Sequence, residues 1–90
     1  MTKIETIKIL TTIGAVYQNF EINQIKKDVW SELLKDIEYQ YAIPALMETL
    51  KTSKFPPTPA DIIERARVET FIAKAEGSRQ IEGNGNKSLS

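Results

Sequence analysis

The sequence predicts an all-α protein, a small bundle of about four helices with a flexible C-terminal tail. Apolar residues recur at steps of three and four along most of the chain, the periodicity of helices with one buried face. A strong helix-start signal stands at Thr58-Pro59, and three of the four glycines fall in the polar segment 77–90. We therefore expect residues 1–76 to form one helical domain, and residues 77–90 to form a disordered tail.

The first helix is predicted from Thr2 to about Gln18. Its apolar stripe consists of Ile4, Ile7, Leu10, Ile13 and Tyr17, widened by Ile9, Val16 and Phe20. Gly14 lies inside this segment, where glycine costs about 1 kcal/mol relative to alanine. We expect this glycine to allow a close helix crossing, with a hinge as the alternative. Residues 19–23 are expected to break the helix.

The second helix is predicted from about Gln24 to Lys35. One stripe is formed by Ile25, Val29, Trp30, Leu33, Leu34 and Ile37. Because Trp30 lies within the stripe, we interpret it as a core anchor, with a partner-facing side chain as the alternative.

The third helix is predicted from about Glu38 to Thr52, with Asp36 as its cap. Its apolar face consists of Tyr39, Ile43, Leu46, Met47 and Leu50. Pro44 conflicts with this assignment, since proline inside a helix removes a hydrogen bond and crowds the carbonyl four residues earlier. We expect one helix that kinks at this proline; the alternative is that regular helix begins only near Pro44.

The fourth helix has the clearest beginning, because Thr58 suits an N-cap, Pro59 a first helical residue and Asp61 an acidic third residue. The helix is predicted to run from Pro59 to about Ala75. We expect Phe55, in the proline-rich connector before it, to insert into the core and fix the angle of this helix.

The apolar face of the fourth helix rotates along its length. Its first half carries Ile62, Ile63 and Ala66, and its second half carries Val68, Phe71, Ile72 and Ala75 on a different face. A single core surface does not accommodate both sets, so the second half is expected to protrude. The alternative is that Phe71 and Ile72 complete the core.

The composition argues against most kinds of chemistry. Twelve basic and twelve acidic side chains give a net charge of zero, whereas non-specific nucleic-acid binding needs an excess of Lys and Arg. The chain has no Cys and no His, which excludes disulfides, thiolate nucleophiles and histidine bases. The Gly-x-Gly near residue 83 has no strand before it and is no phosphate loop. We expect no enzyme, no catalytic residue, no cofactor and no metal.

No membrane association is expected either. The first ten residues alternate polar with apolar side chains and lack the apolar stretch of a signal peptide. No segment reaches the roughly 20 apolar residues that cross a bilayer. The expected compartment is the cytoplasm.

Three segments carry a resemblance to a known family. They are Val16-Tyr17-Gln18-Asn19-Phe20, the Trp-x-x-Leu-Leu stretch that begins at Trp30, and the Phe-Pro-Pro-Thr-x-x-Asp-Ile stretch that begins at Phe55. In this order the chain resembles the loader-and-inhibitor proteins of bacteriophage replicative helicases, over roughly Ile9 to Arg67.

The resemblance implies a compact helical N-terminal domain and a largely unstructured C-terminal part that engages the hexameric replicative helicase. Such a protein holds the ring inactive, hands it to an origin-bound initiator protein and performs no chemistry itself. It would act in the host bacterial cell and is not expected to bind DNA directly. Combined with the rotated apolar face, the resemblance predicts helicase-binding residues at Val68, Phe71, Ile72 and Ile81.

Two other functions stay open. One is a small helical DNA-binding replication or regulatory protein, although the candidate recognition segment, residues 39–45, holds no Arg or Lys and contains a proline. The other is a protein that binds a host helicase loader. DNA binding that strengthens at low salt would favour the first.

Overall fold

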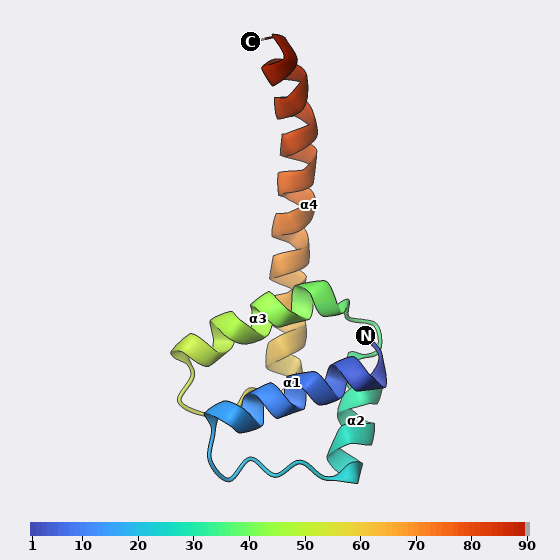
Figure 1. Ribbon diagram of the computed structural model, residues 1–90, viewed down its shortest axis with the longest axis vertical. Coiled ribbons are helices and arrows are strands. Elements are labelled where there is room, and N and C mark those ends of the chain that lie inside the picture. The colour runs from blue at the N-terminus through green and yellow to red at the C-terminus, as the bar shows by residue number, and fades with distance from the viewer. Residues whose placement is uncertain (90) are drawn as a thin grey trace.

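The computed structural model describes the backbone of residues 1–89 and the side chains of residues 1–76. Its four helices are α1 (Lys3–Val16), α2 (Gln24–Leu34), α3 (Tyr39–Thr52) and α4 (Pro59–Leu89). No strand occurs in residues 1–89, so the all-α prediction is confirmed. The molecule measures 56 × 25 × 17 Å, and its length comes from α4, which projects beyond the three shorter helices (Figure 1).

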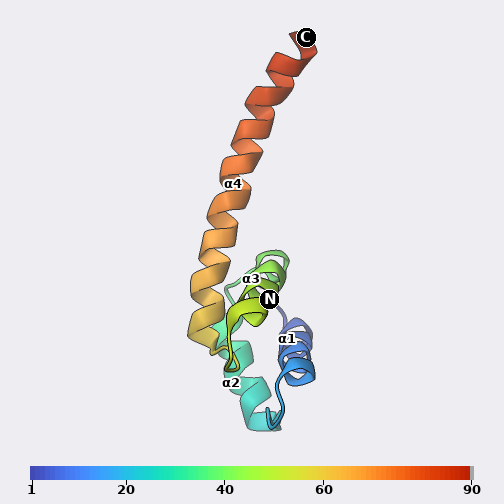
Figure 2. The same cartoon turned by 90° about the vertical axis from the view of Figure 1, so that its left-hand side faces the viewer.

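The helices are arranged so that α1 and α4 lie on opposite sides of the bundle. α2 and α3 each pack against both α1 and α4 and fill the space between them (Figure 2). In the described part of the chain no helix combines the length and hydropathy needed to cross a bilayer.

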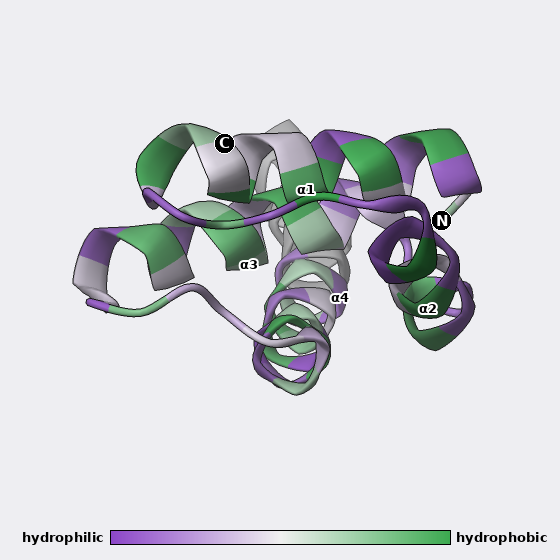
Figure 3. Cartoon of the chain, turned by 90° about the horizontal axis from the view of Figure 1, so that it is seen from below, coloured by the Kyte–Doolittle hydropathy of each residue, from purple (hydrophilic) through white to green (hydrophobic). Residues whose placement is uncertain are grey.

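A single apolar core joins the four helices. Its buried members are Ile9, Leu10, Ile13, Trp30, Leu34, Ala42, Leu46 and Ile62. Seen from below, α1, α2 and α3 lie on three sides of the start of α4, and hydrophobic segments alternate with hydrophilic ones along them (Figure 3). Trp30 is 8% exposed and meets Phe20 edge-to-face, with ring centroids 6.3 Å apart, so its predicted role as a core anchor is confirmed.

The ends of α1 are fixed by local hydrogen bonds. Thr2 and Glu5 form a reciprocal capping box at its start. After α1 the backbone turns at Asn19, whose φ is 65°, and the predicted break at residues 19–23 is confirmed. Asn23 then caps α2 by accepting a hydrogen bond from the Lys26 backbone N–H at 2.8 Å.

Gly14 does not mark a helix crossing, so that expectation is wrong. A Cβ at this position would lie 3.3 Å from Cδ1 of Ile22 and 3.8 Å from Phe20, both in the segment between α1 and α2. The glycine therefore gives room to a folded-back loop. Ile4 and Val16 of the predicted α1 stripe are exposed, while Thr6 and Ile9 are buried.

The predicted stripe of α2 is only partly correct. Trp30 and Leu34 are buried, but Ile25, Val29 and Leu33 are exposed. These three residues follow one another at steps of four and form a separate line along the helix. α2 presents one narrow face to its neighbours, so the wide stripe is split between core and surface.

The prediction that Asp36 caps α3 is also wrong. Glu38 occupies the N-cap position and makes no side-chain cap bond. The helix continues through Pro44, as the single-helix prediction required. Its buried residues are Ala42, Ala45 and Leu46, whereas Met47, predicted to face the core, is exposed.

The start of α4 follows its prediction. The Thr58 backbone N–H donates to Asp61 Oδ2 at 2.9 Å, and the Asp61 N–H donates to Thr58 Oγ1 at 3.3 Å. The prediction for Phe55 is wrong: it is 76% exposed, and Pro57 is buried instead. The helix continues to Leu89, past the end expected near Ala75. The boundary between a helical domain and a tail at residue 76 stays a prediction.

Candidate functional site

The candidate site is an exposed apolar face of α4. Ile62 and Ala66 are buried, whereas Val68, Phe71 and Ile72 are 42%, 74% and 40% exposed. Each helical residue turns the side chain by about 100°, which places Phe71 and Val68 on the side of α4 roughly opposite Ile62 and Ala66, and Ile72 on the adjoining flank, about 100° from the buried pair. We call Val68, Phe71 and Ile72 the outer stripe.

The structure thus brings three of the four predicted binding residues onto one helix face. The side chain of the fourth, Ile81, lies outside the described residues. α4 packs on α2 and α3 through its first turns and then continues beyond them (Figure 1). The outer stripe is therefore not a completion of the core, since Phe71 and Ile72 both remain accessible to a partner.

One edge of the outer stripe is ordered by an ion pair within α4. Arg65 Nη2 donates to Glu69 Oε1 at 3.0 Å across one helical turn. Beside this pair Val68 borders a shallow cleft of about 370 Å³ that reaches Thr49 and Ser53 at the end of α3. The stripe is consequently continuous with the surface of the bundle on this side.

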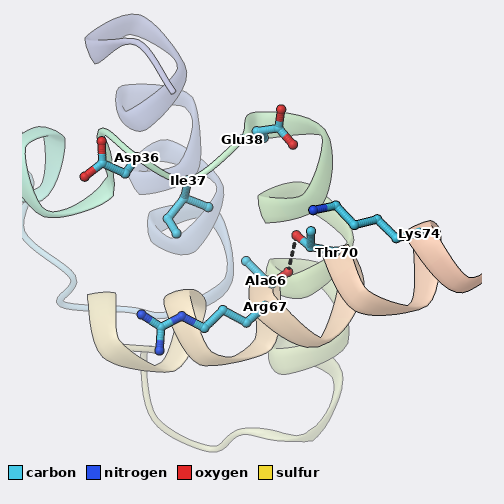
Figure 4. Close-up of a pocket in the computed structure, with 7 residues that line it drawn as sticks. All are labelled: Asp36, Ile37, Glu38, Ala66, Arg67, Thr70 and Lys74. Atoms are coloured by element: carbon cyan, nitrogen blue, oxygen red, sulfur yellow. Dashed lines mark hydrogen bonds between the residues drawn. The ribbon is translucent and has the colours of Figure 1, made fainter.

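The other edge of α4 borders a larger cleft, which opens toward the connection between α2 and α3. It has a volume of about 630 Å³ and is lined by Asp36, Ile37, Glu38, Ala66, Arg67, Thr70 and Lys74 (Figure 4). We call it the charged cleft. Sequence reasoning missed it, because the two walls are some 30 residues apart along the chain and no local pattern joins them.

Among the described residues, two titratable groups have shifted pKa values. Hydrogen bonds from Lys3 and then Gln24 hold the pKa of Asp28 below its usual value, and a hydrogen bond to Glu32 raises the pKa of Lys35. Both pairs are exposed: Asp28 of α2 joins Lys3 of α1, and Lys35, the residue after α2, joins Glu32. Among residues 1–76, no group of three or more acidic side chains is placed to hold a metal ion. The arrangement on α4 is suited to non-covalent binding through apolar contact.

A comparison with protein families gives one match. The family model for the N-terminal domain of phage gene 39 protein matches residues 1–63. No curated protein and no solved structure matches the chain. The matched segment contains α1, α2, α3 and the first turn of α4, so both the outer stripe and the α4 wall of the charged cleft lie beyond it.

Proposed function

The chain belongs to the family of the N-terminal domain of phage gene 39 protein, a helicase loader and inhibitor, and from this premise we propose a specific role. The protein binds the hexameric replicative helicase, holds it inactive and helps load it at the replication origin. An origin-bound initiator protein then receives the ring. The protein acts in the cytoplasm of the host bacterium and makes no direct contact with DNA.

The observation that carries the proposal is the outer stripe. Phe71 is 74% exposed on a helix that is already formed, so it can serve as a rigid anchor for a partner pocket. Burying a Phe or Ile side chain contributes about 1.5–3 kcal/mol. The two largest residues of the stripe, Phe71 and Ile72, therefore supply a substantial part of the binding energy of a modest interface.

Inhibition requires no chemistry from the bound protein. A ligand that prefers the inactive arrangement of the helicase shifts the population toward that arrangement. A tenfold preference corresponds to about 1.4 kcal/mol, which is less than one buried anchor contributes. An anchor such as Phe71 supplies this preference when its pocket exists only in the inactive arrangement.

The double variant Phe71→Ala, Ile72→Ala tests the proposal. Because both side chains are exposed, the variant is expected to keep the helical circular-dichroism signal and the melting temperature. It should lose capture of purified hexameric replicative helicase and lose inhibition of the helicase ATPase.

The matched control is Phe55→Ala, Leu33→Ala, which also removes one exposed aromatic and one exposed aliphatic side chain. It should capture and inhibit as the unmodified protein does. A folded Phe71→Ala, Ile72→Ala variant that still inhibits would remove the outer stripe from the interface. A gel shift at low salt adds the test for DNA, where a retarded band would favour the DNA-binding alternative.

A further inference from the structure

The charged cleft has two walls of opposite charge. The connection between α2 and α3 contributes the carboxylates of Asp36 and Glu38, and α4 contributes the cations of Arg67 and Lys74. In Figure 4 Arg67 extends toward the end of the cleft near Asp36, and Lys74 extends toward Glu38. All four residues are exposed.

The four charges of the cleft are not committed to ion pairs with other described residues. Ion pairs join other residues on α2, α3 and α4, but within residues 1–76 none of the four cleft charges takes part in one. Between the walls lie Ile37, which is partly buried, and Ala66, which is 1% exposed. The cleft therefore combines an apolar floor with cations on one side and carboxylates on the other, none of them in an ion pair with a residue of the segment 1–76.

This distribution selects a class of partner. A segment with a basic side chain toward Asp36 and Glu38, and an acidic one toward Arg67 and Lys74, pairs all four charges at once. A nucleic acid carries only negative phosphates, and the two carboxylates would repel it. The complementary partner is a protein segment with charges of both signs around a small apolar side chain.

The cleft and the outer stripe share α4, and this continuity identifies the partner. Phe71 follows Arg67 by one turn and precedes Lys74 by three residues, so the two cations of the cleft flank the largest residue of the stripe. A protein bound over Phe71 thus reaches the cleft.

We propose that the charged cleft binds a segment of the replicative helicase that carries both acidic and basic side chains, in addition to the contact at the outer stripe. This inference rests on the proposed function. The outer stripe supplies most of the affinity for the helicase, and the charged cleft sets the orientation of the loader on the helicase subunit.

Charge reversal tests the cleft separately from the stripe. The quadruple variant Asp36→Lys, Glu38→Lys, Arg67→Glu, Lys74→Glu reverses both walls and keeps the net charge at zero. All four residues are exposed, and the melting temperature should stay close to that of the unmodified protein. Binding of purified hexameric replicative helicase, from the phage and from its host, is expected to weaken about tenfold or more at low salt.

A second variant controls for long-range charge effects. Arg67→Glu, Lys74→Glu alters one wall only, and Lys8→Glu, Lys54→Glu produces the same change in net charge at two exposed positions outside the cleft. The first should weaken capture about tenfold, and the second should leave capture within about twofold of the unmodified protein.

The outcomes separate the two proposals. If the unmodified protein captures helicase and the folded quadruple variant captures it equally well, the cleft is not a binding site and the proposed function stands. If Lys8→Glu, Lys54→Glu weakens capture as strongly as Arg67→Glu, Lys74→Glu, general charge explains the loss and the cleft is again refuted. If the unmodified protein captures neither helicase, both proposals fail.

Discussion

Gly14 offers a sharp test of how local propensity competes with packing. The residue lies inside α1 with no positive φ, so an alanine fits its backbone conformation. Replacing glycine by alanine inside a helix stabilises it by about 1 kcal/mol. Against this gain, the new Cβ would stand 3.3 Å from Cδ1 of Ile22.

The size of the opposing effect follows from the neighbour. A 3.3 Å contact is a few tenths of an ångström too short, and Cδ1 is the far end of a flexible side chain in a loop. Moving it costs a fraction of the propensity gain. We therefore expect Gly14→Ala to stabilise the protein by about 0.5 kcal/mol, which raises the melting temperature by roughly 2–4 °C for a domain of this size.

Thermal and urea denaturation followed by circular dichroism measure this effect. Ala15→Gly is the matched control, because Ala15 is exposed at the adjacent position of the same helix and reports the propensity difference without the contact. It should lower stability by up to about 1 kcal/mol. If Gly14→Ala instead destabilises the protein, the loop around Ile22 is too rigid to move, and the reasoning from a flexible neighbour is refuted.

Three further predictions concern the core, a cap and a surface carboxylate. Trp30→Ala should lower the free energy of unfolding by about 3–5 kcal/mol, and a urea midpoint equal to that of the unmodified protein would exclude a core role for Trp30. Thr58→Ala should cost about 1 kcal/mol, because the Asp61 N–H loses its side-chain acceptor; an unchanged melting temperature would show that this cap contributes nothing. Asp28 should titrate below 3.8 in a carbon-13 NMR experiment, and Lys3→Met should move its midpoint upward, since the Lys3 hydrogen bond is the largest cause of the lowered pKa. Because the folded state lowers this pKa, the contribution of Asp28 to stability is present above pH 3.8 and is lost as the pH falls through the pKa of the folded state. A titration midpoint of Asp28 that Lys3→Met leaves unchanged would contradict the hydrogen bond between Lys3 and Asp28.

Local signals in the sequence were sufficient to predict where the four helices begin. The start of α4 at Thr58 and Pro59 and the break before α2 depend on backbone groups within three or four residues of one another. Steps of three and four in the apolar residues predicted the existence of all four helices for the same reason. The rotation of the apolar face of α4 was also visible in the sequence, and it led to the outer stripe.

The sequence did not determine which apolar residues are buried. Ile25, Val29 and Leu33 match the helical period as well as Trp30 and Leu34 do, yet only Trp30 and Leu34 face the core. In the connector before α4, Pro57 is buried and the larger Phe55 is exposed. Hydrophobicity and spacing describe a helix face, but burial also requires another element on that side.

The charged cleft depended on tertiary structure altogether. In the sequence, Asp36 and Glu38 lie beside a predicted helix start, and no local pattern distinguishes Arg67 or Lys74. Only the packing of α4 against α2 and α3 brings the two walls opposite each other. The physical reason is range: capping and helical periodicity act between neighbours along the chain, whereas a cleft is formed by distant segments whose positions the whole core fixes.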